Sequence, residues 1–517
     1  MTLTDKTPTQ LMAQWAGGIK KQYKTAFMTA FILGLLIHMP ALLSDIPNHD
    51  GLGSMYFDQN MITSGRWFLT VACGFSSYYT IPWMIGLLSL LFLGATAVAL
   101  TALLELEDTG AVMLVSGLLV SFPALASTFA YVFTMDGYML ALFLAVLAVF
   151  CTKKWRYGFF AGAVCLAFSM GTYQAYLSFA ILLCLYQVLV IFLEEKGFRN
   201  QMRLILHYLY MGVFGAVLYY VLLRVLLFIQ GKELASYQGI DGMTGGLGLH
   251  TIPHMYKDFL SFSIKGNVIF NNVFSLAACS VLVLTTLFVL VRMFLKRKWW
   301  KCPGFFVIIA VAGILAPFGT NVILLISPDV TYHLLMRYQW VVYLILMVAF
   351  VSRYSGTGKA SNLTVWLSFA AAFVLVFNYA VTDNIGYSNL QKRYEKTYAY
   401  CVRLLDRMEQ TEGYYQGIPI AMVGVVGYNP FPVTDITLPV TSNMIGLNGD
   451  TLLYTGENYE VFMKNYLGAS LNILSPEEMG DIYFSPEYIE MESFPAASSV
   501  KIVDGIMYVK TENVGRD

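Results

Sequence analysis

Long apolar runs separated by short polar connections constrain this chain more than any other feature. A membrane-spanning helix needs roughly 20 consecutive apolar residues, and eleven runs in the sequence approach or exceed that length. They cover residues 25–43, 81–104, 111–133, 137–152, 157–172, 173–193, 204–228, 271–295, 304–326, 334–352 and 362–381. The sequence therefore predicts an α-helical polytopic membrane protein with about 11 transmembrane helices.

The composition excludes an ordinary soluble protein of this size. The 517 residues are 57% hydrophobic and only 12% charged, whereas a soluble domain carries about 25% charged residues. The 32 basic residues balance the 32 acidic ones, so no excess charge indicates a nucleic-acid partner. The partner that this composition does indicate is the lipid bilayer.

The run from residue 157 to residue 193 is too long for one membrane span and slightly short for two. Its middle, Gly171-Thr-Tyr-Gln-Ala175, has the composition of a tight polar hairpin. We therefore expect two helices that are joined at the outer face.

The distribution of Lys and Arg predicts the orientation of these helices, because cytoplasmic loops carry an excess of both residues. With the N-terminus in the cytoplasm, seventeen Lys and Arg residues fall inside and six fall outside, up to the last span. An odd number of spans then places the C-terminal region outside. The expected organisation is a cytoplasmic segment 1–24, a transmembrane domain 25–381 with long outer loops 44–80 and 229–270, and an extracytoplasmic region 382–517.

The C-terminal region begins with a charged segment that predicts a helix as far as about Met408. Tyr394, Tyr398, Leu405 and Met408 recur at helical spacing, which is the pattern of an amphipathic helix. We expect this helix to lie on the bilayer surface.

The rest of the C-terminal region has the pattern of a small α/β cap. The apolar run 418–426 predicts a buried strand, and residues 501–510 predict a hairpin. The hairpin is expected to turn at Asp504-Gly505, because both positions of such a turn need residues that tolerate a positive φ.

Polar side chains gather in the connections predicted for the outer face. Charged groups are costly in the hydrocarbon core, so their position indicates where chemistry takes place. Each short outer connection carries an acid, a base or an amide, and Arg224 lies near the outer end of the seventh span. These residues are Asp45, His49, Asp50, Asp58 and Arg66 in the first loop, Asp136 in the second, Tyr173 and Gln174 in the third, and Asp329, His333 and Arg337 in the fifth.

Several of these residues also have a purely structural interpretation. Loop aspartates such as Asp45, Asp58 and Asp329 often cap helices or stay solvated. Arg66 beside Trp67 could anchor the chain at the membrane interface, where both residue types are common. For these positions the sequence leaves both interpretations open.

Arg337 follows His333 by four residues, so one helical turn separates them. The two side chains could simply lie at the outer end of the tenth span, at the membrane interface. Arg337 could equally bind a phosphate, because a guanidinium contacts phosphate oxygens two at a time.

Two short motifs and the overall layout resemble the GtrII family of membrane glucosyltransferases. The motifs are Ser64-Gly-Arg66-Trp-Phe-Leu69, which follows a long first outer loop with an aspartate, and Gly171-Thr-Tyr173-Gln174-Ala-Tyr176. A closing extracytoplasmic α/β tail belongs to the same layout, and the resemblance covers about residues 25–420. It implies a GT-C fold and a hexosyltransferase that uses a polyprenyl-phosphate sugar donor on the outer face.

The resemblance also implies catalytic residues. The catalytic acid of the GT-C fold lies in the first outer loop, where the match falls on Asp50, and a second acid in the second outer loop would be Asp136. Many relatives carry an acidic pair in the first loop, whereas this chain has His49-Asp50. His49 is therefore either a partner of Asp50 or a bystander.

Such a transfer needs a base that takes a proton from the acceptor hydroxyl and cations that hold the leaving phosphate. We expect Arg337 to bind the donor phosphate with help from Arg66 or Arg224. Further contacts to the substrates are expected from Asp58, Tyr173, Gln174 and His333.

The sequence thus predicts a glycosyltransferase of the bacterial plasma membrane. It would transfer a sugar, expected to be glucosyl, from a polyprenyl-phosphate donor to a cell-surface glycan such as O-antigen. Two alternatives stay open: a lipid-linked glycan flippase or transporter, and a ligase or polymerase of surface polysaccharide. No residue spacing demands a cofactor, although neighbouring outer acids could hold a divalent cation.

Overall fold

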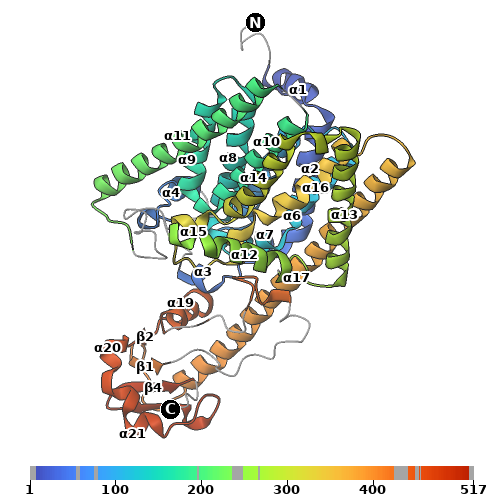
Figure 1. Cartoon of the computed structure of the whole chain (residues 1–517). Helices are drawn as coiled ribbons and strands as arrows, with labels where there is room; N and C mark the ends of the chain where they lie inside the picture. Colours follow the sequence, from blue (N-terminus) through green and yellow to red (C-terminus); the bar gives the residue numbers. More distant parts are fainter. Residues whose placement is uncertain are drawn as a thin grey trace.

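A helical bundle, one long helix that leaves it and a small cap at the end of that helix make up the protein (Figure 1). This architecture comes from a computed structural model of the whole chain. The structure describes residues 7–53, 59–74, 80–194, 197–235, 249–265, 268–423, 440–448, 453 and 456–511.

Within these residues, eight helices are long and apolar enough to cross a membrane when their adjoining 3-10 turns are included. They are α2 (Lys21–Leu43), α5 (Pro82–Leu103), α8 (Met135–Lys154), α10 (Leu177–Leu193), α11 (Phe198–Gln230), α13 (Val273–Lys296), α16 (Trp340–Tyr354) and α17 (Lys359–Glu409). The prediction of an α-helical polytopic membrane protein is confirmed.

The three other predicted runs are also helical, but they are not straight full-length spans. The run 111–133 forms α6 (Thr109–Ser121) and α7 (Pro123–Phe129), which meet at 47°. Pro123 lacks the N–H that would continue the helix, so the break is expected there. The runs 157–172 and 304–326 form two shorter helices, α9 (Gly158–Thr172) and α14 (Pro303–Thr320).

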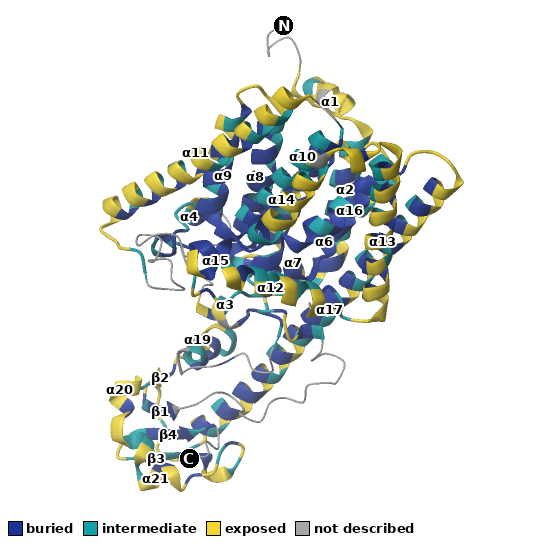
Figure 2. Ribbon diagram, in the orientation of Figure 1, coloured by how far each residue is buried: buried dark blue, intermediate teal, exposed yellow. Residues whose placement is uncertain are grey.

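The surface of the bundle has the character that a lipid environment requires. Large apolar side chains are exposed along α11, α13 and α14, and Figure 2 shows these helices on the periphery. Examples are Phe214, Leu284 and Phe306, each more than 40% exposed. In contrast, α7 is buried along its whole length in the centre of the bundle.

Short helices cover the end of the bundle that faces the cap. They are α3 (His49–Gly53), α4 (Leu69–Ala72), α12 (Ile252–Lys265) and α15 (Ile323–Ile326), whereas α1 (Pro8–Gly18) lies at the opposite end (Figure 1). The connections predicted for the outer face lie together here; for example, Phe68 N donates to Gly171 O at 2.7 Å. The hairpin predicted at residues 171–175 is present, since α9 ends at Thr172 and α10 begins at Leu177.

The helix predicted to end near Met408 is the continuation of the last span. α17 runs unbroken for 51 residues from the bundle into the cap. Tyr394 packs against Phe462 and Tyr466 of the cap, and Met408 is completely buried in the core of the cap. The expectation that this helix lies on the bilayer surface is therefore wrong for Tyr394, Leu405 and Met408, which pack against the cap, whereas Tyr398 is 40% exposed.

The cap contains a four-stranded sheet in the order β2-β1-β4-β3. Its elements are β1 (Pro419–Val423), α19 (Gly456–Leu467), β2 (Asn472–Ile473), α20 (Pro476–Met479), α21 (Pro486–Ile489), β3 (Val500–Val503) and β4 (Ile506–Lys510). The predicted hairpin is confirmed: β3 and β4 are antiparallel and turn at Asp504 and Gly505, both with positive φ. The predicted strand is β1, which lies parallel to β2 and β4.

Phe462 should be central to the stability of the cap, because its side chain is completely buried between α17 and α19. Phe462→Ala is expected to destabilise the cap by about 3–5 kcal/mol, the usual cost of emptying a buried aromatic site. Limited proteolysis of the cap measures this. Phe484, 68% exposed, is the matched control, and Phe484→Ala should change the stability by less than about 0.5 kcal/mol. Equal sensitivity of the two variants would contradict the described core.

Candidate functional site

A polar cavity of about 400 Å³ lies where the bundle meets the C-terminal region. Its walls come from α12, from the 3-10 turn Leu334–Arg337 that precedes α16, and from residues 442–448 of the C-terminal region. The lining residues are Asp258, Ser261, Phe262, Lys265, Tyr332, His333, Leu334, Arg337, Ser442, Asn443, Ile445 and Asn448.

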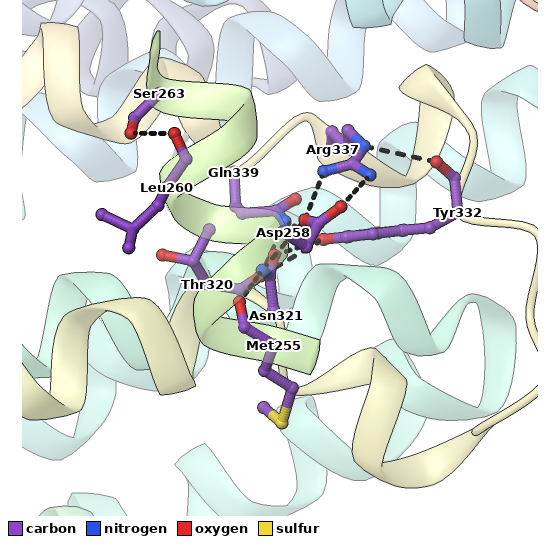
Figure 3. Close-up of polar contacts among 9 residues, drawn as sticks. All are labelled: Met255, Asp258, Leu260, Ser263, Thr320, Asn321, Tyr332, Arg337 and Gln339. Carbon is purple, nitrogen blue, oxygen red and sulfur yellow. Dashed lines mark hydrogen bonds and ion pairs between the residues drawn. The ribbon is translucent and has the colours of Figure 1, made fainter. Parts of the chain in front are cut away.

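An ion pair between Arg337 and Asp258 forms one wall of the cavity (Figure 3). Arg337 Nη1 and Nη2 each lie 2.7 Å from a carboxylate oxygen of Asp258, so the contact is two-pronged. The guanidinium also lies over the rings of Tyr332, at 3.8 Å, and Phe262, at 4.7 Å. Both charged side chains are mostly buried. This geometry holds the guanidinium in one fixed place.

Amide and hydroxyl groups from α14 and α16 hold Asp258 and Tyr332 in place. Asn321 donates to Asp258 Oδ2 at 3.0 Å and accepts from the Tyr332 hydroxyl at 3.1 Å. Gln339 donates to the Tyr332 hydroxyl and to Thr320 O, each at 2.7 Å. The ion pair is thus fixed by the C-terminal end of α14, where Thr320 is the last helical residue (Figure 3).

The cavity retains hydrogen-bonding capacity for a ligand. A guanidinium has five N–H groups. Two of those of Arg337 contact Asp258 and one donates to Tyr332 O, so two have no hydrogen-bond partner among the described residues. Lys265 adds an exposed ammonium group. Burial and, to a lesser extent, the charge of Arg337 lower the pKa of His333, so the ring stays neutral near pH 7. With the lining Ser and Asn side chains, these groups suit a phosphate and several hydroxyls.

A second group of predicted residues assembles beside the first outer loop. Arg66 Nη1 donates to the Tyr138 hydroxyl at 3.1 Å and lies over the ring of Tyr173 at 5.2 Å. The rings of Tyr138 and Tyr173 are stacked at 4.2 Å. Gln174 donates to Ser64 O at 3.1 Å, which joins the two sequence motifs in space.

Gly65 is required for this arrangement, because it has a φ of 76° and a side chain there would meet the Tyr219 hydroxyl at 2.6 Å. The Tyr219 hydroxyl donates to Gly65 O at 3.0 Å. Both the left-handed conformation and the close approach suit only glycine. The motif Ser64-Gly-Arg66 therefore serves to place Arg66 against the tyrosines.

The two predicted acids differ in their surroundings. Asp136 is 2% exposed in the first turn of α8, and its Oδ1 accepts from Gly137 N at 2.9 Å. Asp50 is exposed on α3. Leu52 attaches α3 to the cap, because it packs in the core of the cap, and Asn48 stabilises the start of α3 by accepting from Gly51 N at 2.7 Å.

Residues 440–448 connect the loop of Asp50 with the polar cavity. A side chain at Gly446 would lie within 3.4 Å of the Asn48 amide, two residues before Asp50, and Asn443 and Asn448 of the same segment line the cavity. Asp50 is not among the described residues of the cavity lining. The loop that carries Asp50 approaches the segment that forms the cavity wall through Asn48.

The predicted site residues therefore fall into separate groups. Arg337 and His333 share the cavity, and Arg66, Tyr173 and Gln174 form the second cluster. Arg224 is exposed on α11 and belongs to neither group. Asp58 and the side chain of His49 lie outside the described residues.

Asp258 and Lys265 were not predicted as site residues. Both lie on α12, inside the segment 229–270 that we predicted only as a long outer loop. A signal was present, because Ile252, Met255 and Phe259 recur at the spacing of an amphipathic helix. Among the residues that the structure describes, no group of three or more His, Cys, Asp or Glu side chains is placed to hold a metal ion.

A comparison with protein families decides the identity of this bundle. The sequence model of the family described as Glucosyl transferase GtrII matches residues 39–354. The chain belongs to this family. It is thus a membrane glucosyltransferase, and the resemblance stated from the two motifs is confirmed. Neither a curated protein nor a solved structure matches the chain.

The family match has informative limits. It begins before the first outer loop and ends with α16, so it contains both motifs and Arg337 but not α17 or the cap. The resemblance expected over residues 25–420 is thus longer than the match at both ends. Most of the cavity lining lies in the matched region, whereas Ser442, Asn443, Ile445 and Asn448 come from outside it.

The Arg337–Asp258 pair should be strongly coupled. Asp258→Ala and Arg337→Ala are each expected to cost on the order of 3 kcal/mol, because each leaves one charge buried without its partner. The double variant should cost less than the sum of the two. Thermal unfolding of the purified protein in detergent measures this. Glu105→Ala removes a half-exposed acid from a pair at the other end of the bundle and should cost no more than about 1 kcal/mol. Additive effects of the two single variants would show that the pair is not formed.

Proposed function

We propose that this GtrII glucosyltransferase transfers a glucosyl group from a polyprenyl-phosphate donor to a cell-surface glycan on the extracytoplasmic face of a bacterial plasma membrane. The observation that carries this proposal is the polar cavity at the cap end of the bundle, with its ion pair, exposed ammonium group and hydrogen-bonding side chains. Such a lining suits both parts of the donor headgroup. Cations bind the phosphate, and Ser and Asn side chains bind sugar hydroxyls.

An apolar groove supports a lipid-linked donor. A cavity of about 580 Å³, lined almost entirely by apolar side chains, runs between α9, α10, α11 and α14. Gly319 near the end of α14 closely approaches Ile181 of α10, and the next two residues, Thr320 and Asn321, hold the polar site. α14 thus links the groove to the cavity. We assign the groove to the polyprenyl chain and the cavity to the phosphate and sugar.

Asp50 is the proposed general base. Asp50 is exposed, and Asn48, two residues earlier, lies close to Gly446 of the segment 440–448, so an acceptor held under the cap could reach the carboxylate. Asp136 is the proposed assisting acid, and its burial suits a role in positioning rather than in proton transfer. Arg337 and Lys265 hold the phosphate. Arg66 is a proposed second cation for the phosphate, whereas Tyr173 and Gln174 are buried and are proposed to hold Arg66 and its loop in place.

Asp50→Asn tests the assignment of the base. The variant keeps the shape of the side chain but cannot accept the proton, so the rate of donor consumption should fall by about 10²–10⁴. The purified protein is incubated with polyprenyl-phosphate glucose and a glycan acceptor, and the loss of donor is followed. Asp329→Asn, which changes another exposed acid outside the cavity, is the matched control and should keep the full rate. Normal turnover by folded Asp50→Asn would reject this base and direct the search to Asp258.

Cysteine labelling on intact cells tests the proposed orientation. Asn443 is exposed on the cavity wall, so Asn443→Cys should react with a membrane-impermeant thiol reagent added outside. Cys302 is the exposed natural cysteine and lies near the opposite end, next to Arg297, which donates to Leu193 O. Cys302 should react only after the membrane is opened. The reverse pattern would place the cavity in the cytoplasm and overturn the proposal.

A further inference from the structure

A second polar cavity, of about 350 Å³, lies at the end of the bundle opposite the cap. It forms where the C-terminal ends of α8, α10 and α16 meet the beginning of α11. The lining residues are Glu105, Thr152, Lys153, Lys154, Trp155, Arg156, Gln187, Val190, Ile191, Glu194, Asn200, Arg203, Leu204, His207 and Arg353. The proposed transfer reaction uses none of them.

The charges of this cavity are unbalanced. Five cationic and two acidic side chains line it, which leaves a net charge of +3 with His207 neutral. Both acids are already paired: Glu105 contacts Lys153 at 2.9 Å and Arg353 at 3.0 Å, and Glu194 contacts Arg353. Burial acts to raise the pKa of Glu105, but these two cations outweigh it and lower the pKa, so the acid is ionised at pH 7.

The remaining three cations are available to a ligand. Lys154, Arg156 and Arg203 are exposed and make no ion pair within the described part of the chain. Lys154 ends α8, Arg156 lies in the turn that follows it and Arg203 lies near the beginning of α11, and all three line the same cavity. Two guanidinium groups and one ammonium group around a cavity are the donor set that binds phosphate oxygens.

The surroundings of the cavity favour a phosphate that belongs to a lipid. Trp155 lines the cavity and is 54% exposed, and Trp is enriched at the level of lipid headgroups. His207 contacts Phe159 at 5.4 Å, and from there an exposed apolar surface continues over Phe160 and Phe214, whose rings stack at 5.8 Å. A phosphate in the cavity would therefore have apolar surface beside it for acyl chains.

We propose that this cavity binds the phosphate of an anionic phospholipid in the leaflet opposite the transfer site. Basic pockets between transmembrane helices are suited to such headgroups. The bound lipid would hold the end of α8 against the beginning of α11, next to the pairs of Glu105 and Glu194 that already connect the ends of α8, α10 and α16. Binding should therefore raise the thermal stability of the bundle.

The test measures thermal unfolding of the full-length protein in detergent while phosphatidylglycerol is titrated into the micelles. Phosphatidylcholine and inorganic phosphate are titrated in parallel. Phosphatidylglycerol should stabilise the protein, whereas phosphatidylcholine should not. In Lys154→Ala/Arg203→Ala the apparent affinity for phosphatidylglycerol should fall by about tenfold or more, since each basic residue near a lipid surface strengthens binding several-fold.

Lys298→Ala/Lys301→Ala is the matched control, because it removes two exposed cations at the same end of the bundle but outside the cavity. Its affinity should stay within about twofold of the unmodified protein, and the proposal is overturned if both double variants lose the same affinity. If millimolar inorganic phosphate stabilised the protein as much as the lipid does, and added lipid then gave no further stabilisation, the cavity would be assigned to free phosphate. This result would overturn the lipid assignment.

A second measurement needs no variant that could fail to fold. Phosphatidylglycerol with a photoreactive headgroup is cross-linked to the unmodified protein, and the modified peptides are identified. Labels at residues 153–156 and 200–207 support the proposal. Labels spread over all basic segments of that end, including 296–301, would contradict it.

Discussion

Because the hydrocarbon core of a bilayer offers no hydrogen-bond partners, polar groups of this chain must find partners within the protein or lie at an end of the bundle. Hydroxyl groups inside the helices donate to the carbonyl four residues earlier, as Ser89 and Thr101 do. His38 is completely buried, and its two ring nitrogens lie 2.7 Å from the Tyr387 hydroxyl and 2.8 Å from Val120 O. Charged side chains are concentrated at the two ends, and this separation sets where ligands can bind.

The two ends use charge differently. At the cap end, Arg337 lies against two aromatic rings and is paired with Asp258, so the guanidinium is fixed before any ligand arrives. At the opposite end the cations outnumber the acids, and several are exposed. A fixed, hydrogen-bonded cation suits a reaction that needs one geometry. Exposed cations suit the lipid headgroup proposed above.

α17 connects the cap to the polar cavity. Arg393 donates to Asn448 O and to Gly446 O, and Asn389 donates to Leu447 O at 2.7 Å. The long helix thereby holds the segment 440–448 against the bundle, and this segment forms a wall of the polar cavity. That wall lies outside the family match, so under the proposed function the cap could vary the acceptor without a change in the proposed donor site.

The sequence alone determined the class of fold, the eleven helical runs, the hairpin at residues 171–175 and the β3–β4 turn at Asp504-Gly505, because these depend on local apolar length and local backbone preference. Its two motifs also indicated the family. Only the tertiary structure decided which polar side chains meet. Asp258 and Arg337 are separated by 78 intervening residues, and no local pattern joins them. The same holds for the end of the last span: residues 394–408 have an amphipathic pattern that suits a bilayer surface or a protein core equally well, and packing against Phe462 selects the core. The periodicity of the sequence predicts that one face of a helix is apolar. What covers that face, lipid or protein, is decided only when the whole chain folds.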